Sequence, residues 1–200
     1  EFYTHPTALP SIARGSINLD LHRRDFGINT LALRLDGRHY GELLDPWGGG
    51  RDLRERQIRV LHSLSFVDDP TRMLRAVRLE KRLGFVIEER TLELLHRALP
   101  TLEDVSGERI RGELSQIFRE DRLLDIMARL QELGLLPAIH PALSWSGPLG
   151  RQFLAARSFS PPPSWRLEGP HSQESLLYAV WLAGLGTQAR ADLCDRMHFP

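Results

Sequence analysis

Hydrophobic and polar residues follow different patterns in the first third of the chain and in the remainder. In the first third, short apolar runs alternate with turn residues, a pattern typical of strands joined by tight connections. Residues 31–35 and 39–44 are expected to form two strands, and Asp36-Gly37 between them is a common two-residue hairpin turn. Residues 45–50 are expected to form a flexible connection, and residues 58–61 a last strand.

From Phe66 onward, apolar residues recur at intervals of three and four, which is the pattern of amphipathic helices. Glycine and proline residues supply the expected helix ends. The expected helices cover residues 70–83, 91–98, 107–119, 121–133, 149–157, 173–185 and 187–197. A mixed first part followed by a helical remainder predicts the α+β class.

The first of these helices has a recognisable start and two different faces. Asp69 suits the N-cap because its carboxylate can accept a hydrogen bond from a first-turn amide, and Pro70 suits the first helical position. At roughly 100° per residue, one arc of the helix is apolar and the opposite arc is basic. The apolar arc contains Met73, Ala76, Val77, Leu79 and Leu83, and the basic arc contains Arg75, Arg78, Lys81 and Arg82. The basic arc predicts that Arg75 and Arg78 bind RNA phosphates.

Arg72 falls inside the apolar arc, three residues after Asp69. A charge is costly there without a partner, so Arg72 and Asp69 are expected to lie side by side. A carboxylate next to a guanidinium can read the Watson–Crick edge of cytosine or adenine, because both bases offer an exocyclic amine beside a ring acceptor and uracil does not. The alternative is an ion pair between Asp69 and Arg72 that only caps the helix.

The composition indicates a folded chain without extreme charge. Its 200 residues are 42% hydrophobic, which is enough for a packed core. Lys plus Arg and Asp plus Glu number 26 each, so binding to nucleic acid would depend on local basic patches. Cys194 is the only cysteine, which excludes an internal disulfide and a multi-cysteine zinc site. With no apolar run of membrane-spanning length, we expect a cytoplasmic protein without a membrane partner.

A second cluster of functional groups is formed by Arg23, Arg24 and Asp25, with Asn29 four residues after Asp25. Two guanidiniums suit a triphosphate, and a carboxylate with an amide suits a ribose hydroxyl. A charged helix end facing solvent would have the same composition, so both interpretations remain open for this cluster alone.

Four motifs occur in an order that resembles one family. They are residues 23–30 (RRDFGINT), residues 45–49 (DPWGG) with Asp52-Leu53 and Ile58-Arg59, residues 69–76 (DPTRMLRA) and residues 107–110 (GERI). Over about the first 120 residues, the chain resembles the class II tRNA nucleotidyltransferases and poly(A) polymerases. The resemblance implies part of a polymerase-β-like head (1–62), a helical neck that recognises the base (63–120) and a helical body (121–200), an α+β architecture.

The resemblance also implies roles for individual residues. Those that would bind the nucleotide are Arg24, Asp25, Asn29, Asp69 and Arg72. Those that would brace the neck are Gly107, Glu108 and Arg109. The chain departs from the usual family pattern at Gly27, Thr30 and Asp68, where Thr, Ala and Glu are common.

The implied activity is the template-independent addition of CMP and AMP, or of AMP alone, to the 3′ end of tRNA or another RNA. ATP and CTP would be the substrates and Mg²⁺ the cofactor. The Gly-Gly loop and the Asp-x-Asp metal ligands of the family have no counterpart in this sequence, so we expect it to contain no catalytic residue. The metal ligands are expected upstream of Glu1. The chain is then expected to be a catalytically incomplete piece of a longer protein. The alternative is a non-catalytic RNA-binding or assembly module derived from this family.

Overall fold

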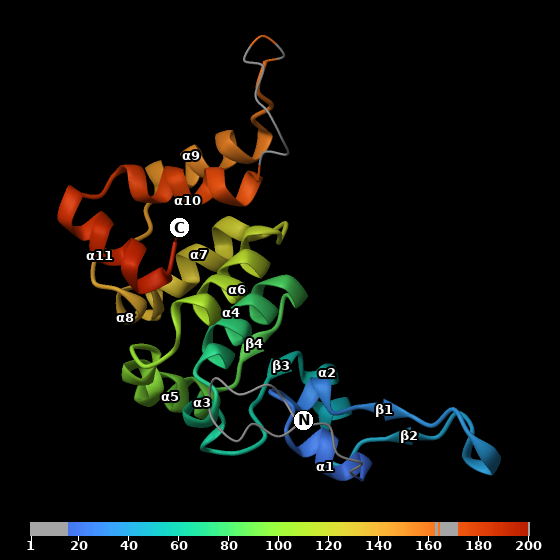
Figure 1. Ribbon diagram of the computed structural model, residues 1–200. Coiled ribbons are helices and arrows are strands. Elements are labelled where there is room, and N and C mark those ends of the chain that lie inside the picture. The colour runs from blue at the N-terminus through green and yellow to red at the C-terminus, as the bar shows by residue number, and fades with distance from the viewer. Residues whose placement is uncertain (1–15, 163, 165–171, 200) are drawn as a thin grey trace. The chain divides into compact units, whose positions relative to one another are not determined.

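Figure 1 shows the computed structural model of the chain, in which residues 16–162, 164 and 172–199 are described. The chain divides into two compact units, Glu1–His62 and Ser63–Pro200. The expected division into head, neck and body stays a prediction. Within the described ranges, no helix is both long enough and apolar enough to cross a membrane.

The first unit contains short helices and short strands. In chain order they are α1 (Ile17–His22), η1 (Gly27–Asn29), β1 (Ala32–Leu33), η2 (Gly37–His39), β2 (Leu43–Leu44), α2 (Gly49–Glu55) and β3 (Gln57–Ile58). Strands β1 and β2 pair antiparallel, with Ala32 opposite Leu44 and Leu33 opposite Leu43. Leu21, Phe26 and Ile58 form the buried apolar centre of this unit.

Two expectations for this unit are wrong. Asp36-Gly37 does not close a two-residue hairpin, because the chain between β1 and β2 is longer and contains the 3₁₀ turn η2. Residues 45–50 are not simply a flexible connection, since α2 begins at Gly49. The carboxylate of Asp45 accepts hydrogen bonds from the amides of Gly49 (2.6 Å) and Gly50 (3.0 Å), which satisfies donors that a helix start leaves unpaired.

Helices make up most of the second unit. Its elements are α3 (Ser65–Asp68), α4 (Thr71–Leu83), β4 (Val86–Ile87), α5 (Glu89–Ala98), η3 (Leu99–Leu102), α6 (Gly107–Phe118), α7 (Leu123–Glu132), α8 (Leu135–Ile139), α9 (Gly147–Ser158), α10 (Gln173–Ala183) and α11 (Thr187–Met197). The seven expected helices are all present, and the short helices α3 and α8 are additional. The α+β class is confirmed.

Helix α4 packs against α6 and α7 through the apolar arc expected from the sequence, with two changes. Met73, Ala76 and Val77 are fully buried. Leu74 is also fully buried, whereas Leu83 is 42% exposed because it lies in the last turn, next to the left-handed C-cap Gly84.

An aromatic cluster joins α6, α9 and α10. Phe118 of α6 packs edge-on against Phe153 of α9 (5.7 Å between ring centroids) and against Tyr178 (4.9 Å) and Trp181 (6.1 Å) of α10. Figure 1 shows α9 and α10 side by side. Such edge-to-face contacts favour one arrangement of these helices beyond the area that they bury.

Gly107 allows the start of α6 to approach α11 closely. A Cβ at this position would lie 2.2 Å from the carbonyl oxygen of Arg196 and 2.7 Å from the Cα of Met197. No side chain fits at these distances, so any substitution must displace the backbone of α11. The expectation that Gly107 braces this unit therefore has a physical basis in helix packing.

Gly107→Ala is expected to lower the free energy of unfolding by about 1–3 kcal/mol, the usual cost of overpacking. The control is Gly112→Ala in the same helix, where a Cβ would meet no atom within 4 Å. That substitution should raise the free energy of unfolding by about 0.5–1 kcal/mol, since glycine is unfavourable inside a helix. Urea unfolding of both variants measures the two changes, and equal stability of Gly107→Ala and the parent would contradict the close approach.

Candidate nucleotide-binding site

Asp25 and Asn29 of the first unit are brought together as expected. Asp25 is only 8% exposed, and its Oδ1 accepts hydrogen bonds from the amide of Phe26 (3.0 Å) and from Nδ2 of Asn29 (2.7 Å). These contacts fix the carboxylate, while Asn29 remains at the surface. A carboxylate and an amide held in this way present an acceptor and a donor to a hydroxyl group.

Arg24 is held by Asp20, a residue that the sequence analysis did not assign. Nη2 of Arg24 lies 2.6 Å from Oδ2 of Asp20, and Nη2 of Arg23 lies 2.5 Å from Oδ1. The hydrogen bonds from Arg24 and then from Arg23 lower the pKa of Asp20 to about 2. The spacing of three and four residues on one helix edge could have indicated this cluster. All three side chains stay partly exposed, so a phosphate can compete with Asp20 for the guanidiniums.

A buried ion pair supports the same unit. The side chain of Asp52 is fully buried, and its Oδ1 accepts a hydrogen bond from Nε of Arg59 (3.0 Å). Oδ2 of Asp52 has no hydrogen-bond partner among the described residues, and a Cβ at Gly27 would lie 2.3 Å from it. A threonine at position 27, usual in the resembled family, would require this carboxylate to turn. The sequence gives no sign of the burial, since aspartates are mostly exposed.

Asp69 of the second unit joins the start of α4 to α6 through one oxygen atom. Its Oδ1 accepts hydrogen bonds from the amide (3.0 Å) and the hydroxyl (2.6 Å) of Thr71, at the start of α4. The same oxygen accepts a hydrogen bond from Nη2 of Arg109 in α6 (2.7 Å). Within the described part of the chain, no donor binds Oδ2 of Asp69, so this oxygen is available to a ligand. Asp69 thus binds a first-turn amide as expected, although α4 begins at Thr71 with Pro70 as its N-cap, one residue later than the sequence predicted.

Arg72 does not form the ion pair with Asp69 that the sequence suggested as one alternative. Among the described residues, Asp69 pairs with Arg109 instead. Nη1 of Arg72 donates to the hydroxyl (2.7 Å) and the carbonyl oxygen (3.3 Å) of Ser65, at the start of α3. Because Ser65 is fully buried, these bonds anchor the guanidinium to the turn that carries Asp69.

The three residues expected to brace the neck occupy the first turn of α6. Gly107 lies against α11, as described above, and Arg109 reaches Asp69. Glu108 is exposed and lines a polar cavity with Arg111 and Tyr178. Helix α6 therefore connects the turn before α4 with α11.

Arg75 faces α6, and Arg78 faces the turn that follows α6. Nη2 of Arg75 lies 2.8 Å from Oε1 of Glu113, and Nη1 of Arg78 lies 3.2 Å from Oε1 of Glu120. The side chains of Arg78 and Glu120 are only 14% and 16% exposed. These pairs give both arginines a role in helix packing, and their contact with RNA stays a prediction.

No group of three His, Cys, Asp or Glu side chains in the described ranges is arranged to hold a metal ion. None of the described residues is assigned as a ligand of Mg²⁺.

Two family models match the chain. Residues 3–59 match a model described as the poly A polymerase head domain, and residues 84–146 match one described as the probable RNA and SrmB-binding site of polymerase A. The A-adding tRNA nucleotidyltransferase of Geobacter sulfurreducens is 48% identical over 145 residues, which are 72% of this chain and 16% of that protein.

Solved structures show the same relationship. The Thermotoga maritima CCA-adding enzyme complexed with tRNA is 35% identical, with a TM-score of 0.75 over 92% of this chain and 45% of that one. A CCA-adding enzyme complexed with ATP is 35% identical, with a TM-score of 0.77 over 92% of this chain and 44% of that one.

The chain belongs to the tRNA nucleotidyltransferase and poly(A) polymerase family. It spans less than half the length of these relatives. Within this chain, the resemblance is carried by the RRDFGIN segment after α1 in the first unit and by the DPTR segment at the start of α4 in the second.

The role of Arg78 in packing can be tested directly. Arg78→Ala is expected to lower the free energy of unfolding by about 1–3 kcal/mol. The substitution removes the hydrogen bond from Arg78 to the carboxylate of Glu120, which is too little exposed for water to replace it fully. Arg90→Ala, at an exposed position of α5, should change it by no more than about 0.5 kcal/mol. Unchanged stability of Arg78→Ala, together with weaker and less salt-dependent RNA binding, would assign Arg78 to phosphate contact and contradict the packing role.

Proposed function

We propose that this chain is part of an enzyme that adds nucleotides to the 3′ end of tRNA without a nucleic-acid template. ATP and CTP are the substrates, and the base is selected by Asp69 and Arg72. Support comes from the tRNA-adding and ATP-bound relatives and from the geometry of the DPTR segment. The observation that carries the proposal is that the two carboxylate oxygens of Asp69 differ in their hydrogen bonds.

Oδ1 of Asp69 is occupied by structural hydrogen bonds, whereas Oδ2 has no donor in the described part of the chain. Oδ2 can accept a hydrogen bond from the exocyclic amine of adenine or cytosine, and Arg72 can donate to the adjacent ring nitrogen. Uracil would place a carbonyl oxygen against Oδ2, so two acceptors would meet. The pair therefore favours A and C over U.

Adenylate addition has support from the Geobacter relative, which is named A-adding, and addition of both bases from the CCA-adding structures. Adenine and cytosine present the same donor and acceptor order to Asp69 and Arg72, so this pair admits both. In the first unit, Arg24 binds the triphosphate, and Asp25 and Asn29 bind the ribose. Mg²⁺ is included in the proposal because the resembled family implies it, and no described residue is assigned as its ligand.

Asp69→Ser in the full-length protein tests base selection. Serine can still cap α4, so the loss of stability should stay below the roughly 1 kcal/mol expected for Asp69→Ala. The ratio of ATP or CTP incorporation to UTP incorporation into tRNA should fall, because the acceptor for the exocyclic amine is gone. The measurement compares the three nucleotides at a temperature where both variants are folded. An unchanged ratio in Asp69→Ser would leave Asp69 as a helix cap only.

Arg24→Ala in the full-length protein tests phosphate binding. The exposed pair with Asp20 contributes little stability, so the melting temperature should change by no more than a few degrees. The KM for ATP should rise several-fold, since a charge-assisted contact to phosphate is lost. Arg54→Ala, at an exposed position of α2, is the control and should leave KM unchanged. A lowered melting temperature with an unchanged KM would show that Arg24 acts only in the fold.

A further inference from the structure

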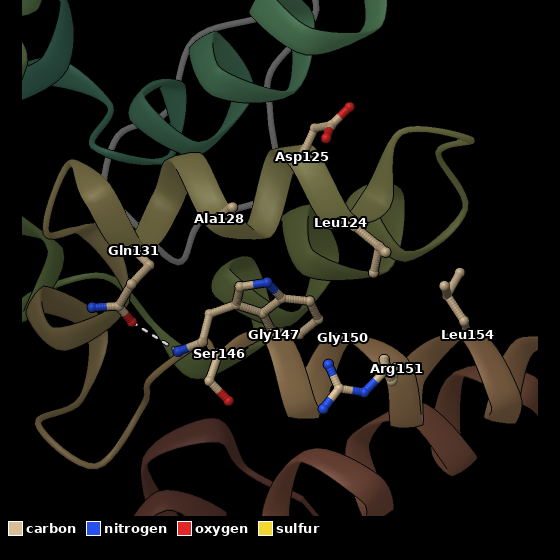
Figure 2. Close-up of a pocket in the computed structure, with 10 residues that line it drawn as sticks. Leu124, Asp125, Ala128, Gln131, Ser146, Gly147, Gly150, Arg151 and Leu154 are labelled. Atoms are coloured by element: carbon tan, nitrogen blue, oxygen red, sulfur yellow. Dashed lines mark hydrogen bonds between the residues drawn. The ribbon is translucent and has the colours of Figure 1, made fainter.

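A cavity of about 450 Å³ lies between α7 and α9, apart from every residue assigned above to the nucleotide (Figure 2). Leu124 of α7 and Leu154 of α9 provide apolar walls, and the segment between α8 and α9 contributes Trp145. Figure 2 shows Leu124 and Asp125 on α7 and Arg151 on α9, on opposite sides of this space. The volume lies in the lower part of the range of small-ligand sites, about 300–1,000 Å³, so it suits one small planar group better than a helix.

The position of Trp145 is fixed by two contacts and by the close approach of Gly150. Its amide donates to Oε1 of Gln131 (2.8 Å), and its ring packs edge-on against Phe153 (4.8 Å). Gly150 is buried beside it, and a Cβ there would lie 3.5 Å from Cζ2 of Trp145. The indole is nevertheless only partly buried and lines the cavity. It therefore presents a rigid aromatic surface to a ligand.

The indole nitrogen of Trp145 also differs from that of Trp181. Nε1 of Trp181 donates to the carbonyl oxygen of Ser144 (3.0 Å). In the part of the chain that the structure describes, Nε1 of Trp145 has no such acceptor, and it is not sealed from solvent. Tryptophan at a wet surface with an open N–H is typical of binding sites.

Arg151 provides a positive charge at the edge of the cavity. Its Nη1 lies over the start of α9, 4.0 Å from the position of a Cβ on Gly147. Neighbouring arginines have acceptors, since Arg122 pairs with Asp125 (2.8 Å) and Arg157 donates to the carbonyl oxygen of Glu120 (2.9 Å). Arg151 is exposed and forms no ion pair with any described residue. Its charge is available to an anion.

We propose that this cavity binds one unpaired nucleotide of the RNA substrate, with the base stacked on Trp145 and the adjacent phosphate paired with Arg151. An aromatic surface next to an unpaired guanidinium is the arrangement that recognises single-stranded RNA without strong sequence preference. The family model described as a probable RNA-binding site includes Trp145 and ends at Ser146. The identity of the ligand as the RNA substrate rests on the proposed function.

The test measures equilibrium binding of a fluorescent single-stranded oligoadenylate and of tRNA to the full-length protein, without nucleotide triphosphate. Trp145→Leu should weaken binding of the oligonucleotide about 5-fold to 100-fold, the range for loss of one base–aromatic stack. Trp145→Phe keeps an aromatic ring and should retain most of the affinity. Melting temperatures confirm that each variant is folded.

Arg151→Gln provides a second variant that does not disturb packing, because the side chain is exposed. It should weaken binding and reduce the slope of log affinity against log salt by about 0.7, the value for one phosphate contact on a single strand. Arg90→Gln, exposed on α5, is the matched control and should leave the slope unchanged. An RNA carrying a photoreactive 5-iodouridine should cross-link to Trp145.

Unchanged affinity in folded Trp145→Leu and Arg151→Gln would overturn the proposal. It would also be overturned if these variants kept RNA binding but lost binding to a protein partner, which would make the cavity a protein-docking site. Because binding is measured without catalysis, a protein that binds RNA through this cavity but transfers no nucleotide would contradict the proposed function and leave this site intact.

Discussion

In the second unit, one oxygen atom, Oδ1 of Asp69, ties two helices together. It caps the start of α4 through Thr71 and at the same time holds Arg109 of α6. These contacts fix the side-chain torsions of Asp69, so the remaining oxygen already points in one direction. Ligand binding therefore loses less side-chain entropy than it would with a mobile carboxylate. Recognition of a base needs this fixed direction, because a hydrogen bond weakens steeply when its angle changes.

Other charged groups inside the units act in the same way, by joining elements. Glu80 of α4 is only 3% exposed, and its carboxylate accepts hydrogen bonds from Arg129 of α7 (3.1 Å) and from the amide of Ile87 in β4 (3.4 Å). Asp52 and Arg59 form a comparable pair in the first unit. Removal of one member would leave a buried charge, so these pairs constrain the arrangement of helices more than they add stability.

The sequence predicts the elements well and their partners poorly. The helices α4, α6 and α11 follow from periodicity, and the capping role of Asp69 follows from its position before Pro70. Periodicity also predicted that one face of α4 is basic, but it could not show that Arg75 meets Glu113 of α6 and that Arg78 meets Glu120 in the turn after α6, since these lie 38 and 42 positions away. The same limit explains why Arg109 was not expected at Asp69, 40 positions earlier.

The contact between Arg109 and Asp69 links the proposed base-reading carboxylate to the packing of α6. The start of α6 is held against α11 by Gly107, where no side chain fits, and two residues later Arg109 reaches Asp69. A shift of α6 relative to α4 would therefore move Arg109 and release one of the three hydrogen bonds to Oδ1. Since Arg72 is anchored separately to Ser65, such a shift would change the surroundings of Asp69 and leave those of Arg72 in place. If Asp69 and Arg72 read the base as proposed, the packing of α6 would act on the acceptor alone, and discrimination between bases would respond to packing far from the nucleotide.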